Sequence, residues 1–125
     1  MRVTIYHNPG CGTSHNVLAA IRAAGHEPQI LEYLTTPVTR DAIAALLKSM
    51  NISARVLVRT KEPLFRELGL DENDVTEGDL LDAMAENPIL INRPIVVVED
   101  GENTVTRLCR PSERVKAMLA PRSVQ

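Results

Sequence analysis

The turn at residues 7–14 is the feature that most constrains how this chain can fold. A short apolar, β-branched run at residues 2–6 precedes the turn and predicts a buried strand, because it is too short for a helix. A helical pattern follows at about residues 14–24, with Gly25 as the expected terminator. Residues 28–34 predict a second strand, parallel to the first because a helix connects the two. The chain therefore opens with a β-α-β unit.

Cys11 lies in this turn, just past the carboxyl end of the first predicted strand, where ligands of open α/β sheets bind. Pro9, Gly10 and Gly12 beside it suit a tight turn and the close approach of a ligand to the backbone. Unpaired N–H groups and the dipole at the start of a helix favour a thiolate over a thiol. A fall in the thiol pKa from roughly 8.5 to roughly 6.5 needs only about 2.7 kcal/mol of differential stabilisation. We therefore interpret Cys11 as a nucleophile whose sulfur must be open to solvent; the alternative is a small, buried, inert thiol.

The other polar residues of the turn leave more than one interpretation. The spacing Cys11-x-x-Ser14 lacks the second thiol of a dithiol redox motif, so any redox intermediate at Cys11 must be resolved from outside the turn. His7 and His15 stand at a regular spacing on either side of Cys11, but no fourth ligand is evident, and we predict no metal site. Asn8, Thr13 and Ser14 could cap the helix or line an anion site, and we expect at least one of them to cap.

The remaining chain predicts a helical segment followed by two strands and a last helix. Its expected elements are a helix capped by Thr39, an ambiguous strand or short helix at 53–59, a short helix from Pro63 to about Leu68, a helix with a capping box at Thr76–Asp79 that stops at Asn87-Pro88, a buried strand at 95–98, a hairpin partner at 104–109 and a helix at 112–120. Cys109 is interpreted as a structural strand thiol rather than a resolving one.

Length and composition limit the classes of function. We expect one domain at residues 1–120, with a helical insertion at about 36–90 and a flexible tail at 121–125. The net charge of −2 argues against general nucleic-acid binding. We find neither a membrane-spanning apolar run nor a signal-peptide pattern at the N-terminus. Two cysteines far apart in sequence do not make a disulfide framework, so we expect a cytoplasmic protein.

The order of the expected elements, with a cysteine after the first strand, matches the thioredoxin/glutaredoxin-like fold: an α/β protein with a four-stranded mixed sheet and a helical insertion after the second strand. Three stretches narrow the match. Residues 7–14 (HNPGCGTS), 89–97 (ILINRPIVV) and 107–113 (RLCRPSE) closely resemble the glutaredoxin-coupled arsenate reductases. The resemblance covers nearly the whole chain, and the three motifs together are highly specific.

The resemblance implies a role for each matching residue. Cys11 would attack arsenate, and His7 matches a histidine associated with keeping that cysteine ionised. Arg59, Arg93 and Arg110 match the family's three anion-binding arginines, and guanidinium groups suit an oxyanion. With them we assign substrate binding to the start of the helix, at Gly12, Thr13 and Ser14. The Arg93-Pro94 bond would be cis, which gives Pro94 a structural role.

The resemblance also implies the reaction and its partners. Glutathione, as a co-substrate, would attack the arsenic adduct on Cys11, and glutaredoxin would help to reduce the resulting species and release arsenite. No bound cofactor, nucleic acid or membrane is expected. His15 departs from the pattern, since some relatives have an arginine at its position.

Two other functions fit the same fold. The first is glutathione-dependent thiol–disulfide chemistry at Cys11 without arsenate; relatives of that kind often lack one or more of the three arginines that this sequence has. The second is a transcription regulator that binds RNA polymerase. Such regulators tend to carry Cys-x-x-Cys, and Ser14 argues against that assignment.

Overall fold

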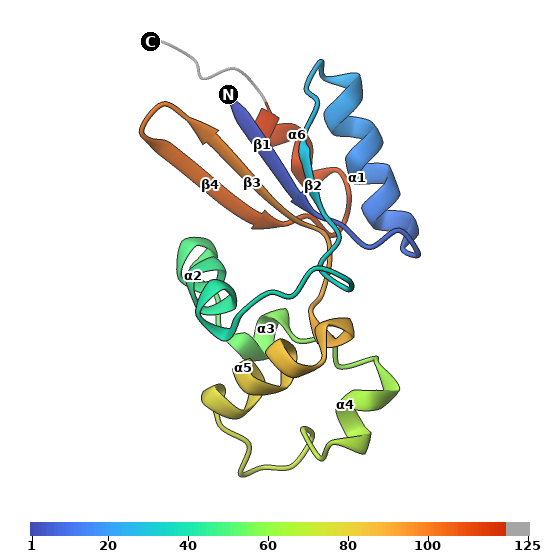
Figure 1. Cartoon of the computed structure of the whole chain (residues 1–125), viewed down its shortest axis with the longest axis vertical. Helices are drawn as coiled ribbons and strands as arrows, with labels where there is room; N and C mark the ends of the chain where they lie inside the picture. The colour runs from blue at the N-terminus through green and yellow to red at the C-terminus, as the bar shows by residue number, and fades with distance from the viewer. Residues whose placement is uncertain (120–125) are drawn as a thin grey trace. The chain divides into compact units, whose positions relative to one another are not determined.

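The computed structural model describes residues 1–119 and divides into two compact units (Figure 1). One unit contains Met1–Glu32 and the chain from Arg93 onward, and the other contains Tyr33–Asn92. The helical insertion expected at about 36–90 falls within the second unit. That the two units form a single domain stays a prediction. The expected tail at 121–125 and the last residue of the helix expected at 112–120 lie outside the described residues.

The first unit is built on a four-stranded mixed sheet. Its strands are β1 (Arg2–Tyr6), β2 (Gln29–Leu31), β3 (Ile95–Asp100) and β4 (Asn103–Leu108), in the spatial order β2-β1-β3-β4. Strands β1 and β2 are parallel, whereas the β1–β3 and β3–β4 pairs are antiparallel. This topology confirms the expected thioredoxin-like fold class. The expected hairpin is also present, with Gly101 in the left-handed region (φ 62°) at its turn.

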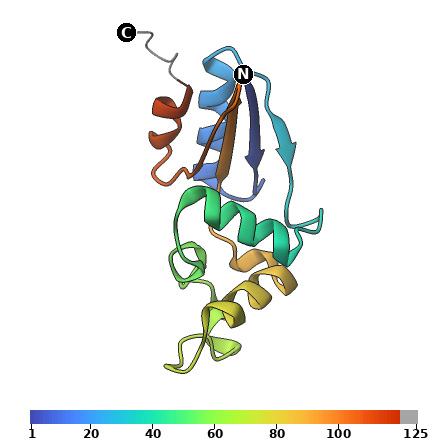
Figure 2. The same ribbon diagram turned by 90° about the vertical axis from the view of Figure 1, so that its left-hand side faces the viewer.

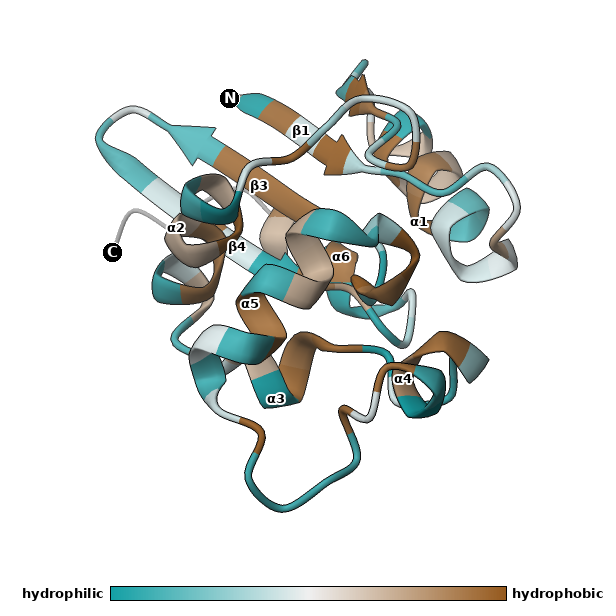
Figure 3. Ribbon diagram, turned by 60° about the horizontal axis from the view of Figure 1, so that its bottom comes forward, coloured by the Kyte–Doolittle hydropathy of each residue, from teal (hydrophilic) through white to brown (hydrophobic). Residues whose placement is uncertain are grey.

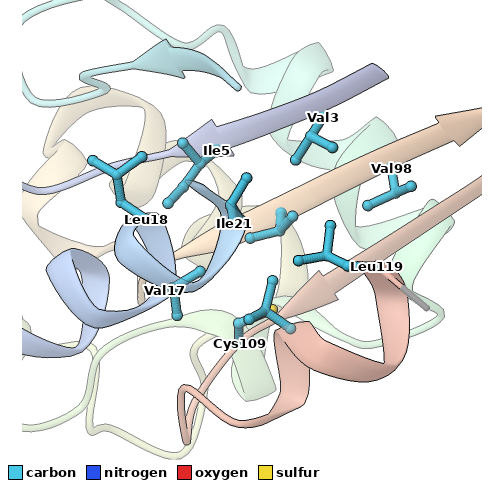
Figure 4. Packing of buried hydrophobic residues seen from close by; sticks show 10 residues of the cluster. Val3, Ile5, Val17, Leu18, Ile21, Val98, Cys109 and Leu119 are labelled. Atoms are coloured by element: carbon cyan, nitrogen blue, oxygen red, sulfur yellow. The ribbon is translucent and has the colours of Figure 1, made fainter. Parts of the chain in front are cut away.

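Two helices, α1 (Gly12–Ala23) and α6 (Arg114–Leu119), cover one face of this sheet (Figure 2). Alternate residues of the central strands point into the layer between sheet and helices, as the period of a strand requires. Figure 4 shows this core, whose buried members are Val3, Ile5, Val17, Leu18, Ile21, Val96, Val98, Cys109, Val115 and Leu119. Strand β3 is hydrophobic over most of its length and hydrophilic only at its end (Figure 3), as expected of a strand in the middle of a sheet.

The strand register brings three distant segments to one edge of the sheet. Tyr6, the last residue of β1, pairs with Ile95, the first residue of β3. Ile95 also pairs with Leu108, the last residue of β4. The residues that adjoin these strand ends therefore leave the sheet at the same edge. They are the loop to Cys11, which follows Tyr6, the Arg93-Pro94 pair, which precedes Ile95, and Arg110, which follows Leu108.

The second unit consists of short helices. They are α2 (Arg40–Met50), α3 (Ala54–Leu57), α4 (Pro63–Glu67), α5 (Glu77–Glu86) and the 3-10 helix η1 (Pro88–Leu90), and α5 packs against α2, α3 and η1. Thr39 caps α2, and Thr76 and Asp79 form the expected capping box of α5. An antiparallel bridge joins Val58 to Ile91.

Some element boundaries differ from those expected. Helix α1 begins at Gly12 rather than near Ser14, and β2 is shorter than the expected strand at 28–34. The ambiguous segment 53–59 contains the helix α3, because the Ser53 hydroxyl accepts a hydrogen bond from the Val56 N–H and caps it. The sequence patterns did not predict η1.

Candidate active site

Cys11 is the N-cap residue of α1, with an extended backbone at φ −111° and ψ 120°. Its side chain forms no capping hydrogen bond, and none of Asn8, Thr13 and Ser14 stands at the N-cap position of this helix. The expectation that one of those three residues would cap this helix is therefore wrong. The reason is that α1 starts directly after the cysteine, so the sulfur occupies the place where a capping oxygen usually lies.

The loop before Cys11 is closed by two hydrogen bonds that Asn8 accepts. The Asn8 carbonyl oxygen accepts from the Cys11 N–H at 3.0 Å, and its Oδ1 accepts from the Gly10 N–H at 2.9 Å. Asn side chains stabilise turns in this way. Asn8 is itself buried at the end of β1. These contacts fix the backbone on which the sulfur is carried.

Ser14 anchors this loop to α1. Its side chain is fully buried, and its Oγ accepts a hydrogen bond from the Asn8 N–H at 3.1 Å. The same Oγ lies 2.6 Å from Nδ1 of His7, which is also buried. Because both contacts occupy the hydroxyl, only the backbone N–H of Ser14 is left to face a substrate. The structure thus places Ser14 in the site as a support beside Cys11.

Among the described residues, His7 makes no hydrogen bond to the Cys11 sulfur. Its Nδ1 contacts Oγ of Ser14 instead. Burial and the neighbouring His15 lower the pKa of His7, and the charge of Glu32 opposes them. A histidine with a lowered pKa is neutral at neutral pH. His7 is therefore suited to orient Ser14 and not to act as a cation beside the sulfur.

Two arginines converge on Cys11 from the ends of β3 and β4. Nη1 of Arg110 lies 3.6 Å from the Cys11 sulfur and donates to the Arg93 carbonyl oxygen at 3.0 Å. The Arg93 guanidinium also acts on the sulfur, both as a hydrogen-bond donor and as a charge. The Arg93-Pro94 bond is cis, as the resemblance implied, and so is Arg110-Pro111.

The balance of these effects favours the thiolate. Burial raises the pKa of Cys11, but the Ser14 backbone N–H and the guanidinium groups of Arg93 and Arg110 outweigh it and lower the pKa to about 7. Since the Cys11 side chain makes no full capping hydrogen bond, the Ser14 N–H acts on it as a nearby dipole. A substantial fraction of the thiol is therefore ionised near neutral pH.

The expectation that the Cys11 sulfur is open to solvent is wrong. Cys11 is 8% exposed, so it is buried rather than open to solvent, although it is not sealed as Cys109 is. The space beside it is less restricted: a Cβ atom added at Gly12 would meet no atom within 4 Å apart from its chain neighbours and its own helix backbone, and Thr13 is half-buried. A small ligand could therefore approach along the first turn of α1.

Arg59 belongs to the second unit, where it directly follows the bridge at Val58. Its backbone N–H donates to the Leu90 carbonyl oxygen at 2.8 Å, and its Nε lies 3.7 Å from the Glu62 carboxylate. That Nε is buried and has no hydrogen-bond partner among the described residues. The convergence of Arg59 with Cys11 stays a prediction from the resemblance.

Cys109 has a different environment from Cys11. It is fully buried in the core of the first unit, with its sulfur 3.6 Å from that of Met118. Burial raises its pKa to about 11, against the smaller effects of Arg114 and Arg107. This environment agrees with a structural thiol that stays protonated.

Metal-binding clusters and membrane-spanning helices are both absent among the described residues. Within residues 1–119, no group of three or more His, Cys, Asp or Glu side chains could hold a metal ion. No helix among the same residues is long and apolar enough to cross a membrane.

Two features of the site were not predicted from the sequence. One is the hydrogen bond from Arg110 to the backbone of Arg93, and the other is the contact of His15 with the loop. Both depend on main-chain carbonyl groups, which leave no signal in residue type. Only the arrangement of the loops could reveal them.

The chain is similar to arsenate reductases over most of its length. A family model described as the ArsC family matches residues 6–118. The arsenate reductase of Escherichia coli strain K12 is 53% identical over 117 residues, which cover 94% of this chain and 80% of that protein.

Two solved structures agree with the fold. A putative arsenate reductase from Yersinia pestis has a TM-score of 0.83 at 46% identity, covering 92% of this chain and 98% of its own. An arsenate reductase from Vibrio cholerae has a TM-score of 0.86 at 38% identity, covering 94% and 97%.

Proposed function

This chain belongs to the ArsC family, and from that premise we propose that it reduces arsenate to arsenite with Cys11 as the nucleophile. The observation that carries the proposal is the position of the Arg110 guanidinium, 3.6 Å from the Cys11 sulfur. A positive group at that distance stabilises the thiolate and can also bind an incoming oxyanion.

The first step is attack of the Cys11 thiolate on arsenic. Arsenate is itself an anion at neutral pH, so the approach of a thiolate is opposed by charge repulsion. Arg93 and Arg110 offset this repulsion, and the free N–H groups at the start of α1 provide further donors for the oxyanion. A sulfur–arsenic bond forms and one arsenate oxygen leaves as water, which gives an arsenic(V) adduct on Cys11.

The reduction needs two electrons that Cys11 does not supply, because position 14 is serine. We assign them to two external thiols, glutathione and then glutaredoxin. Glutathione replaces a second oxygen on arsenic, and its sulfur is then attacked by a glutaredoxin thiolate. A mixed disulfide forms between these two partners, the arsenic is reduced to arsenic(III), and hydrolysis of its bond to Cys11 releases arsenite.

Other parts of the proposal follow from this chemistry. Arg59 would be a third guanidinium for the substrate, and Gly12, Thr13 and Ser14 would present backbone N–H groups to it. His7 would act through Ser14. No bound cofactor takes part, and a cytoplasmic location fits the need for reduced thiols.

The decisive experiment measures arsenite formation in the presence of glutathione and glutaredoxin. We expect activity in the wild-type protein, none in Cys11→Ser, and none in the wild type when either thiol partner is left out. Reduction of a glutathione mixed disulfide without any arsenite would support thiol–disulfide chemistry instead. Retained arsenite formation in Cys11→Ser would overturn the assignment of the nucleophile.

A further inference from the structure

The side chain of His15 has no part in the mechanism above, yet it contacts the loop that carries Cys11. His15 lies in the first turn of α1, where its backbone N–H donates to the Cys11 carbonyl oxygen at 3.1 Å. Helical side chains lean toward the N-terminus of their helix. The His15 ring accordingly reaches back over the turn, and its Nε2 lies 2.5 Å from the Pro9 carbonyl oxygen. Because a carbonyl oxygen only accepts, Nε2 carries the proton and donates.

The same ring also contacts His7. The two rings meet edge to face, with centroids 5.0 Å apart and an interplanar angle of 87°. His15 is exposed, whereas His7 is buried against Ser14. One exposed side chain therefore supports the start of the loop, at His7, and its middle, at Pro9.

No other interaction found among the described residues ties Pro9 to the helix. The Asn8 hydrogen bonds close the loop on itself, and Ser14 holds only its beginning. Pro9 and Gly10 are exposed, and without the His15 contact they would be held only by the local turn. Movement there would be passed directly to Cys11, the next residue.

We propose that His15 is a positioning residue for Cys11, which acts by holding the Pro9 carbonyl group and the His7 ring and so keeps the sulfur aimed at Arg93 and Arg110. Its relevance to arsenate rests on the proposed function, but its effect on the thiol does not. An arginine at this position could also donate to the Pro9 carbonyl oxygen. It would not offer the aromatic ring that meets the ring of His7.

The test compares His15→Ala and His15→Gln with the wild type by the pH dependence of iodoacetamide alkylation at Cys11, followed by mass spectrometry. We expect His15→Ala to lower the rate at neutral pH by roughly threefold to tenfold and to shift the thiol titration to higher pH, as loss of one supporting hydrogen bond predicts. His15→Gln keeps an N–H donor and should recover most of the rate. Asn16→Ala, an exposed neighbour on the same helix, is the matched control and should behave as the wild type.

A wild-type titration curve in His15→Ala would overturn the proposal, and so would a His15→Gln protein as impaired as His15→Ala. Circular dichroism melting establishes that each variant is folded, so a general loss of structure is recognised. The alkylation assay contains no arsenate. Failure of arsenate reduction in the wild type would therefore count against the proposed function and leave this test intact.

Discussion

Nη1 of Arg110 lies 3.6 Å from the sulfur of Cys11, although 99 positions separate the two residues in the sequence. The same nitrogen donates to the Arg93 carbonyl oxygen, so a main-chain group holds the guanidinium in place. The charge beside the sulfur is therefore oriented before a substrate arrives, which is the condition for effective electrostatic stabilisation.

Replacing Arg110 should weaken the thiolate. We expect Arg110→Ala to raise the apparent pKa of Cys11 by about one unit, because an opposite charge close to the sulfur is lost. Arg110→Lys should have a smaller effect, since it keeps the charge but cannot match the planar fork. Rates of Cys11 alkylation across a pH range measure this apparent pKa in each variant. Arg107→Ala serves as the control because Arg107 is an exposed arginine on β4; an unchanged titration in Arg110→Ala would contradict the assignment.

Ionisation of Cys11 should make stability depend on pH. Folding lowers the pKa of Cys11 to about 7, below the ordinary value of a free thiol, so the native state favours the thiolate. The free energy of unfolding should therefore increase from about pH 7 to about pH 8.5, by about 2 kcal/mol, and this stabilisation is lost as the pH falls through 7. Urea unfolding at several pH values measures the change. Cys11→Ser should lack the increase, and Cys109, present in both proteins, cancels from the comparison.

Ser14→Ala should destabilise the fold as well as the site. The Asn8 N–H would lose its acceptor in a buried position, and His7 would lose its partner. Leaving a buried donor unsatisfied costs about 1–3 kcal/mol of unfolding free energy. Thr36→Ala, at an exposed position outside any helix or strand, should change stability by less than about 0.5 kcal/mol. Equal stability of Ser14→Ala and the wild type would show that the hydroxyl is not a structural anchor.

The two cysteines should differ sharply in reactivity. In the native protein, iodoacetamide should modify Cys11 and spare Cys109, which is fully buried and whose pKa is raised to about 11. Both should react once the chain is unfolded in guanidinium chloride. Peptide mapping by mass spectrometry distinguishes them. Rapid native labelling of Cys109 would reopen its role as a resolving thiol.

Arg59 should affect the substrate more than the thiol. Within the first unit, Arg93, Arg110 and the Ser14 N–H are what lower the pKa of Cys11. If Arg59 binds only the oxyanion, Arg59→Ala should raise the KM for arsenate by roughly tenfold or more, as loss of one charge-assisted contact predicts, and leave the alkylation profile unchanged. Steady-state kinetics together with the thiol titration test this. A normal KM would remove Arg59 from the substrate site.

The sequence predicted the sheet and most of the helices because their signals are local. The buried strand at β3, the cap at Thr39 and the capping box at Thr76 each depend on a few neighbouring residues. The start of α1 was predicted near Ser14 instead of at Gly12, because a cysteine is not among the usual N-cap residues and gave no signal there. The segment 53–59 stayed ambiguous since its strand propensity competed with the cap at Ser53.

The site was predicted only in part, because only some of its signals are local. The position of Cys11 after β1 followed from the local pattern, whereas the arginines came only from the resemblance. The approach of Arg93 and Arg110 to the sulfur depends on the register that aligns Tyr6, Ile95 and Leu108, a long-range property that spacing does not encode. The expectation of a sulfur open to solvent was wrong, and the guanidinium groups of Arg93 and Arg110 that lie against it come from distant parts of the chain.

The full burial of the Ser14 hydroxyl has a consequence for the source of electrons. A cysteine there could form an internal disulfide with Cys11, but sulfur is a poor acceptor and larger than oxygen, so the Asn8 N–H and His7 would lose their shared anchor. In this architecture one side chain cannot both hold the loop together and serve as a built-in reductant. With a serine at this position the nucleophile is held rigidly, and the proposed reaction takes its two electrons from external thiols.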